Sequence, residues 1–155
     1  MEDDRLTPMI GYGTFITSEI FRNKRNIEPC FIPHFRRIIP PAWDAYPFAL
    51  PDPAYPGFFG LKFEVDALQL KELDLIEGVD SKLYYREKVE ILIRGGKKTE
   101  AFIYIPTETT QNRFKITLTA DLNDRWLEFI RQHHNLLREI PEVGWDHTDL
   151  TKFTR

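Results

Sequence analysis

Alternation of apolar and polar residues is clearest in the second half of the chain. Residues 87–94 alternate with period two, residues 97–105 do so again, and Gly95 and Gly96 stand between the two runs. A pair of glycines tolerates the positive φ angles that tight hairpin turns require. The pattern therefore predicts a β-hairpin with a two-residue turn at Gly95-Gly96.

Further strands are predicted in the first half. Residues 8–13 are typical of a short buried strand that ends in a glycine-bracketed turn, and residues 59–65 alternate as a strand with one buried face does. Eight of the 11 prolines fall between positions 29 and 56, and proline cannot donate to a strand ladder. We therefore expect an edge strand over residues 31–39, followed by an ordered, aromatic-rich loop that packs on the body of the protein.

Three segments have helical signals. Asp66 is a good N-cap for a helix over residues 67–77, and Gly78 follows at the position where helices commonly end. Ser18 is a candidate cap for a short helix over residues 19–23. Apolar residues recur at helical spacing over residues 122–138, which predicts another helix there.

The order of these elements indicates an α+β fold. We expect a small, mixed, strongly bent barrel-like sheet with two or three helices packed against it. The length of 155 residues suits one domain over residues 1–155. Residues 1–7 are interpreted as an N-terminal extension, and residues 141–155 as a tail or edge segment.

Composition narrows the classes of function. The net charge is −3, which argues against nucleic acid as a partner because nucleic-acid-binding domains are usually strongly basic. No apolar run reaches the roughly 18 residues of a membrane helix, and the acidic start is unlike a signal peptide. A single cysteine, Cys30, excludes an intramolecular disulfide. We expect a cytoplasmic protein that does not bind membranes.

Glu77 is the most informative single residue. At helical spacing it shares one face with Leu70 and Leu73, so a carboxylate ends an otherwise apolar stripe. Burial and the negative end of the helix dipole both raise the pKa of a carboxyl group. A glutamate in this position is therefore a candidate general acid or base, although a structural role at an exposed helix end stays open.

A second candidate is the turn after the first strand, Gly11-Tyr12-Gly13-Thr14-Phe15. Its glycines let the backbone approach a ligand, and successive N–H groups in such a turn can bind an anion. The turn matches neither a nucleotide-binding P-loop nor a dinucleotide fingerprint. In the segment Tyr84-Tyr85-Arg86, Tyr85 points opposite to its two neighbours, and either tyrosine is a candidate for a pocket wall.

Several of these pieces occur in a recognisable order. They are Tyr12-Gly13-Thr14-Phe15, Tyr46-Pro47-Phe48, Gly60 with Phe63-Glu64-Val65, Leu73-Asp74-x-x-Glu77-Gly78, and Tyr85-Arg86. In this order the chain resembles the γ-glutamylcyclotransferase-like family, which includes AIG2-like proteins and γ-glutamylamine cyclotransferase. The resemblance runs from about residue 9 to residue 105.

The resemblance implies a function. Active members convert a γ-glutamyl amine or amide to 5-oxoproline and a free amine, without a metal or organic cofactor. By the matched positions, Glu77 is the catalytic acid/base, and the backbone of Gly13, Thr14 and Phe15 binds oxygens of the substrate's glutamyl part. Tyr12, Tyr46 and Tyr85 complete the expected binding site, with Tyr46 as a wall that selects the leaving group. Phe15 is bulkier than the residue usual at its position, so we expect a narrowed site.

Two alternatives to an enzyme remain open from the sequence. The same pocket suits a non-catalytic module that binds a small metabolite, because fold resemblance alone does not establish activity. The second alternative is a protein-interaction module that binds its partner through the aromatic surface. The sequence leaves the leaving amine and the oligomeric state undetermined.

Overall fold

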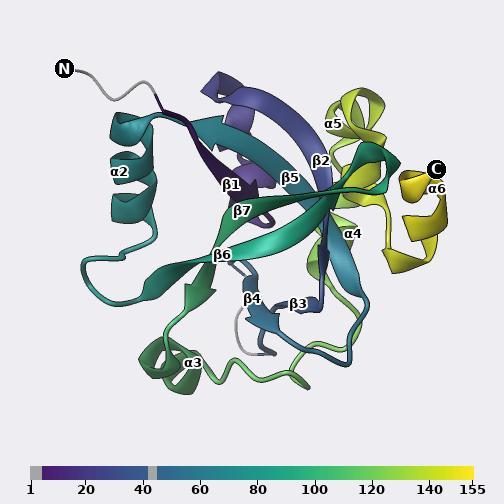
Figure 1. Cartoon of the computed structure of the whole chain (residues 1–155). Coiled ribbons are helices and arrows are strands. Elements are labelled where there is room, and N and C mark those ends of the chain that lie inside the picture. Colours follow the sequence, from purple (N-terminus) through teal and green to yellow (C-terminus); the bar gives the residue numbers. More distant parts are fainter. Residues whose placement is uncertain (1–4, 42–44) are drawn as a thin grey trace.

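The computed structural model describes residues 5–41 and 45–155 (Figure 1). Five strands close into a barrel in the order β1-β5-β2-β6-β7. They are β1 (Thr7–Gly11), β2 (Arg25–Pro33), β5 (Gly57–Val65), β6 (Tyr84–Ile93) and β7 (Lys97–Pro106). Neighbours are antiparallel except β1 and β7, whose parallel pairing at Met9 and Phe102 closes the barrel. The expected α+β class and barrel-like sheet are confirmed.

Part of the proline-rich stretch forms a separate two-stranded sheet of β3 (Phe35–Ile38) and β4 (Phe48–Pro51). The predicted edge strand over residues 31–39 is therefore wrong, because the chain turns at His34, where φ is 61°. Nor is β2 an edge strand. It pairs with β6 only at Cys30 and Phe31, between two prolines, so neither proline has to donate a hydrogen bond to β6.

Both faces of β5 are covered. All its residues but Glu64 are buried, so the single buried face predicted for residues 59–65 is wrong. One face packs in the barrel interior. On the other, Phe59 contacts Phe153 of the C-terminal helix, with ring centroids 5.0 Å apart. The expected tail thus folds onto the barrel as η3 (Pro141–Gly144), η4 (His147–Asp149) and α6 (Leu150–Thr154).

The described residues contain six α-helices rather than two or three. Besides α6 they are α1 (Thr14–Thr17), α2 (Ala67–Ile76), α3 (Glu108–Phe114), α4 (Trp126–Arg131) and α5 (His134–Glu139). The helix predicted over residues 122–138 is really α4 and α5. His133 takes a non-helical conformation between them, and its imidazole lies 2.9 Å from the Phe129 carbonyl.

Two local predictions differ in detail. Ser18 closes α1 by donating its hydroxyl to the Thr14 carbonyl, and the short helix η1 (Ile20–Asn23) is capped instead by Glu19 without a side-chain hydrogen bond. The predicted hairpin is confirmed, but Ile93 lies opposite Lys97. The turn η2 (Arg94–Gly96) is therefore one residue longer than expected, with positive φ at both glycines.

Figure 1 shows α2 on one side of the barrel and α4, α5 and α6 on the other, with the β3–β4 sheet and α3 below. Residues 1–4 of the predicted N-terminal extension lie outside the described residues, and Thr7 already belongs to β1. Among the described helices, none is long and apolar enough to cross a membrane.

Candidate functional site

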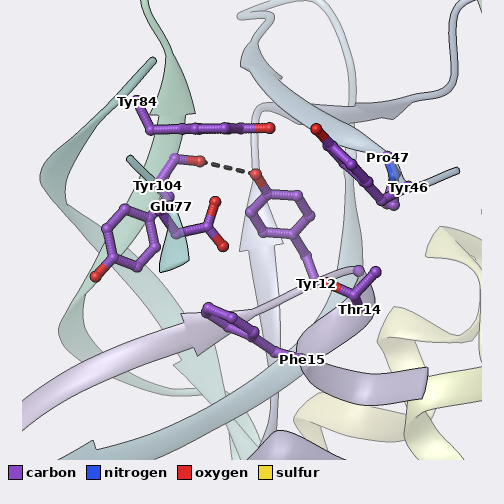
Figure 2. A pocket seen from close by; sticks show the side chains of 9 residues that line it. Tyr12, Thr14, Phe15, Tyr46, Pro47, Glu77, Tyr84 and Tyr104 are labelled. Carbon is purple, nitrogen blue, oxygen red and sulfur yellow. Dashed lines mark hydrogen bonds between the residues drawn. The ribbon is translucent and has the colours of Figure 1, made fainter. Parts of the chain in front are cut away.

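A pocket lies where β1 ends, α1 begins and α2 ends (Figure 2). Nine residues line a small cavity of about 30 Å³, well below the roughly 300–1,000 Å³ typical of small-molecule sites. The nine are Tyr12, Gly13, Thr14, Phe15, Tyr46, Pro47, Glu77, Tyr84 and Tyr104. Glu77 is the one ionisable acid or base other than tyrosine among these nine.

The sequence of α2 places Glu77 at the pocket. Asp66 and Gln69 form the predicted cap as a reciprocal pair, with hydrogen bonds of 2.8 and 3.1 Å. Glu77 ends the helix, and its N–H donates to the Leu73 carbonyl over 2.9 Å. Gly78 then reverses the chain with φ of +67°, and a Cβ atom there would lie 2.8 Å from Leu83. Glycine at this position therefore sets the direction in which the helix ends.

Asp74, one turn earlier, ties α2 to the barrel. The Tyr104 hydroxyl donates to its carboxylate over 2.7 Å, and Arg86 Nε lies 2.9 Å from the same oxygen. These contacts join the last turn of α2 to β7 and β6. The Asp of the Leu-Asp-x-x-Glu-Gly element and the Arg of the Tyr-Arg element thus form one ion pair that holds the helix end in place.

Glu77 lies in a very different environment. Its carboxylate faces the rings of Tyr12, Phe15 and Tyr84 (Figure 2), and among the described residues it makes no hydrogen bond or ion pair. Burial raises the pKa of Glu77 to about 7, because the charged form is desolvated. A carboxyl group with such a pKa can take up and return a proton near neutral pH.

Tyrosines surround the carboxylate. Burial raises the pKa of the Tyr12, Tyr46 and Tyr84 hydroxyls, and the nearby charge of Glu77 raises them further. These phenols therefore stay protonated at neutral pH. The Tyr12 hydroxyl donates to the Tyr104 carbonyl over 2.9 Å (Figure 2). The Tyr84 ring stacks on Phe48 of β4, with centroids 6.0 Å apart, which fixes it as a wall of the pocket.

The turn between β1 and α1 supplies backbone donors. Gly13 precedes α1, and a Cβ atom on it would lie 2.7 Å from the ring of Pro47. Only glycine lets these two segments meet. Within residues 5–41 and 45–155, the N–H groups of Gly13, Thr14 and Phe15 donate to no other group, so they are available to an oxygen of a ligand. The Phe15 ring packs on Phe63 and Tyr104, so most of its bulk lies in the core.

Six of the seven residues predicted for the site line this pocket: Tyr12, Gly13, Thr14, Phe15, Tyr46 and Glu77. The placement of Tyr85 is corrected, because its side chain is 44% exposed outside the pocket and Tyr84 lines it instead. Strand alternation left these two tyrosines as alternatives. Pro47 and Tyr104 were not predicted, and Tyr104 has no local signal because closure of the barrel brings it to the site.

The fold and pocket define an α+β barrel protein with one half-buried carboxyl group in a small aromatic pocket. The chain belongs to the γ-glutamyl cyclotransferase, AIG2-like family, whose model matches residues 10–127. No curated protein matches the chain.

Solved structures share the fold at low identity. A protein of Arabidopsis thaliana is 21% identical over 88% of this chain and 89% of its own, with a TM-score of 0.60. A yeast γ-glutamyl cyclotransferase described as specific to glutathione is 15% identical over 97% of this chain and 95% of its own, with a TM-score of 0.59. An AIG2-like protein of Mus musculus is 20% identical over 72% of this chain and 84% of its own, with a TM-score of 0.56.

Proposed function

We propose that this protein is a γ-glutamylcyclotransferase that converts a γ-glutamyl amine or amide to 5-oxoproline and a free amine. The observation that carries the proposal is the state of Glu77. Among the residues that the structure describes, its carboxyl group has no hydrogen-bond or ion-pair partner and faces aromatic rings. Its pKa is raised to about 7, and the chain belongs to this family.

In the proposed reaction Glu77 moves one proton twice. Its carboxylate takes a proton from the α-ammonium group of the substrate. The free amine then attacks the γ-carbonyl carbon, which forms the ring C–N bond of 5-oxoproline. As the bond to the leaving amine breaks, Glu77 returns the proton to that amine. The attacking nitrogen also gives up its second proton, because the ring nitrogen of 5-oxoproline keeps only one, and the departing amine takes it up and leaves as an ammonium ion. A pKa near neutrality suits both transfers, because neither protonation state is strongly favoured.

The rest of the pocket holds the substrate for this cyclisation. Because attack is intramolecular, the protein mainly has to fix a folded conformation of the γ-glutamyl group. The N–H groups of Gly13, Thr14 and Phe15 bind oxygens of that group, and the rings of Tyr12 and Tyr84 exclude water around Glu77. Tyr46 and Pro47 form the wall on which the leaving group lies.

The test is release of 5-oxoproline from a panel of γ-glutamyl amines, amides and dipeptides. We expect product from the wild type and a loss of at least about a hundredfold in Glu77→Gln, which is the usual size of a general acid–base contribution. Glu72→Gln is the matched control, because Glu72 is an exposed carboxylate on the same helix; it should keep wild-type activity.

A different outcome would identify a binding module. In that case no compound of the panel yields product, and thermal stabilisation by one of them persists in Glu77→Gln. Equal activity of the wild type and Glu77→Gln would rule out the proposed role of this residue.

A further inference from the structure

Arg37 of β3 is the largest fully buried side chain among the described residues, at 2% exposure. Its Nε and Nη2 atoms donate to the two carboxylate oxygens of Asp124, each over 2.8 Å. Its guanidinium also lies 4.7 Å from the ring centroid of Phe58. A buried ion pair of this kind is not by itself a source of stability, because desolvation offsets the attraction.

The third contact is to the loop of the pocket. Arg37 Nη1 donates to the backbone carbonyl of Tyr12 over 2.8 Å. The planar guanidinium can make both sets of contacts at once. Its Nε and Nη2 groups bind the carboxylate side by side, while Nη1 donates in another direction, to the carbonyl. A lysine has a single nitrogen and cannot hold both carboxylate oxygens and this carbonyl in the same arrangement.

The contact fixes the orientation of the peptide between Tyr12 and Gly13. Every described peptide bond is trans, so the N–H of Gly13 points opposite to the carbonyl of Tyr12. Arg37 does not line the pocket, whereas Gly13 does. With the carbonyl held toward Arg37, behind the loop, the N–H of Gly13 is turned to the other side.

We propose that Arg37 is a positioning residue that directs the Gly13 N–H into the pocket, where it binds an oxygen of the glutamyl group. The ligand part of this inference rests on the proposed function; the orientation of the peptide does not. Asp124 in turn holds Arg37. Asp121 fixes the Asp124 segment by accepting from the N–H of Ile39, just after β3, over 3.0 Å. Residues 121–124, which are remote in sequence, thus help to set the orientation of the Tyr12–Gly13 peptide through Arg37.

The chain provides a matched control one residue away. Arg36 also lies on β3 and pairs with an aspartate, Asp52, over 2.8 Å. Its guanidinium also lies over an aromatic ring, 3.9 Å from the centroid of Tyr55. Arg36 makes no contact with the Tyr12–Gly13 peptide. The two ion pairs join the same two groups, and only Arg37 contacts the loop. The Arg36 pair is also more exposed and has one hydrogen bond to its aspartate where the Arg37 pair has two.

The experiment compares Arg37→Met with Arg36→Met. Because Arg37→Met leaves the partly buried carboxylate of Asp124 without this partner, a second pair of variants removes both charges: Arg37→Met/Asp124→Leu and Arg36→Met/Asp52→Leu. We expect the Arg37 variants to raise KM for the best substrate about 10–100-fold, as expected for one lost hydrogen bond to a charged group. The kcat should stay within about threefold, and its pH midpoint should not move.

A merely structural defect gives a different result. It lowers the fraction of active protein, and hence kcat, at unchanged KM. That result, or equal KM values in the Arg37 and Arg36 double variants, would overturn the inference.

A second measurement does not depend on activity. In the free protein, NMR shifts of the Tyr12 carbonyl carbon and the Gly13 amide should change in the Arg37 double variant and stay constant in the Arg36 double variant. If the wild type releases no 5-oxoproline while these shifts change, the proposed function fails and the positioning stands. If the shifts stay constant in both variants, the positioning fails, whatever the activity.

Discussion

Asp74 and Glu77 are carboxylates three residues apart at the end of the same helix, and they have opposite surroundings. Asp74 accepts a hydrogen bond from Tyr104 and pairs with Arg86. Glu77 faces aromatic rings and has no such partner among the described residues. The first fixes the helix on the barrel, and the second is left free to exchange a proton.

The difference shows how α2 can be fixed on the barrel through one carboxylate while a second carboxyl group stays free of ion pairs. An arginine beside Glu77 would stabilise its charged form and lower its pKa. The helix places its ion pair one turn earlier, where it holds the backbone of Glu77 without touching its carboxyl group. Burial alone then raises the pKa of Glu77 to about 7.

The sharpest test exchanges each carboxylate for its amide. Glu77→Gln should lower kcat/KM at least about a hundredfold, because the proton acceptor is lost. Asp74→Asn keeps an acceptor for Tyr104 and should lower kcat/KM less than about tenfold. Steady-state release of 5-oxoproline measures both. An equal loss in two folded variants would mean that Asp74 takes part in the reaction directly.

The two carboxylates should also differ in how stability depends on pH. Folded Glu77 keeps its proton to about pH 7, whereas its ordinary pKa is 4.5. Between these values the folded state binds the extra proton, so its contribution to stability falls as pH rises. Relative to Glu77→Gln, the wild type should lose about 2–3 kcal/mol between pH 5 and pH 8.

Urea unfolding of both proteins at the two pH values measures this change. A difference in stability that does not vary with pH would show that Glu77 is solvated and titrates like an ordinary glutamate.

Much of this fold was accessible from local sequence signals. The hairpin of β6 and β7 follows from alternation and two glycines, and α2 follows from Asp66 at one end and Gly78 at the other. The errors arose where tertiary packing removes the local signal. β5 is covered on both faces, β2 is central despite two prolines, and the C-terminal segment buries Phe153 against Phe59.

Among the residues of the site, too, some carry a local sequence signal and others do not. Glu77 was conspicuous because it conflicts with the apolar stripe of its own helix, and the loop before α1 was conspicuous because of its glycines. Tyr104 and Arg37 carried no such signal. They reach the pocket and its loop through closure of the barrel and through the separate β3–β4 sheet, which sequence spacing does not encode.

The Asp74 contact can be measured directly with a double-mutant cycle. Asp74→Asn and Arg86→Met should each cost about 1–2 kcal/mol of stability, because a charge-assisted hydrogen bond of a partly buried pair is lost. The two losses should not add, and we expect a coupling energy of about 1 kcal/mol. Chemical unfolding of the four proteins measures it. Strict additivity would mean that this pair does not hold the helix end.

The smallest expected effect lies at the other end of α2. Asp66→Ala removes a cap that accepts from the Gln69 N–H over 2.8 Å, and it should cost about 1 kcal/mol of stability. Both Asp74 and Glu77 lie beyond the first two turns, and the contacts of Asp74 with Arg86 and Tyr104 hold that end in place. We therefore expect kcat/KM to stay within about twofold of the wild type. A loss of activity as large as that of Asp74→Asn, measured well below the unfolding temperature, would mean that the whole helix positions Glu77. Retained activity with reduced stability would assign that task to the last turn and its ion pair.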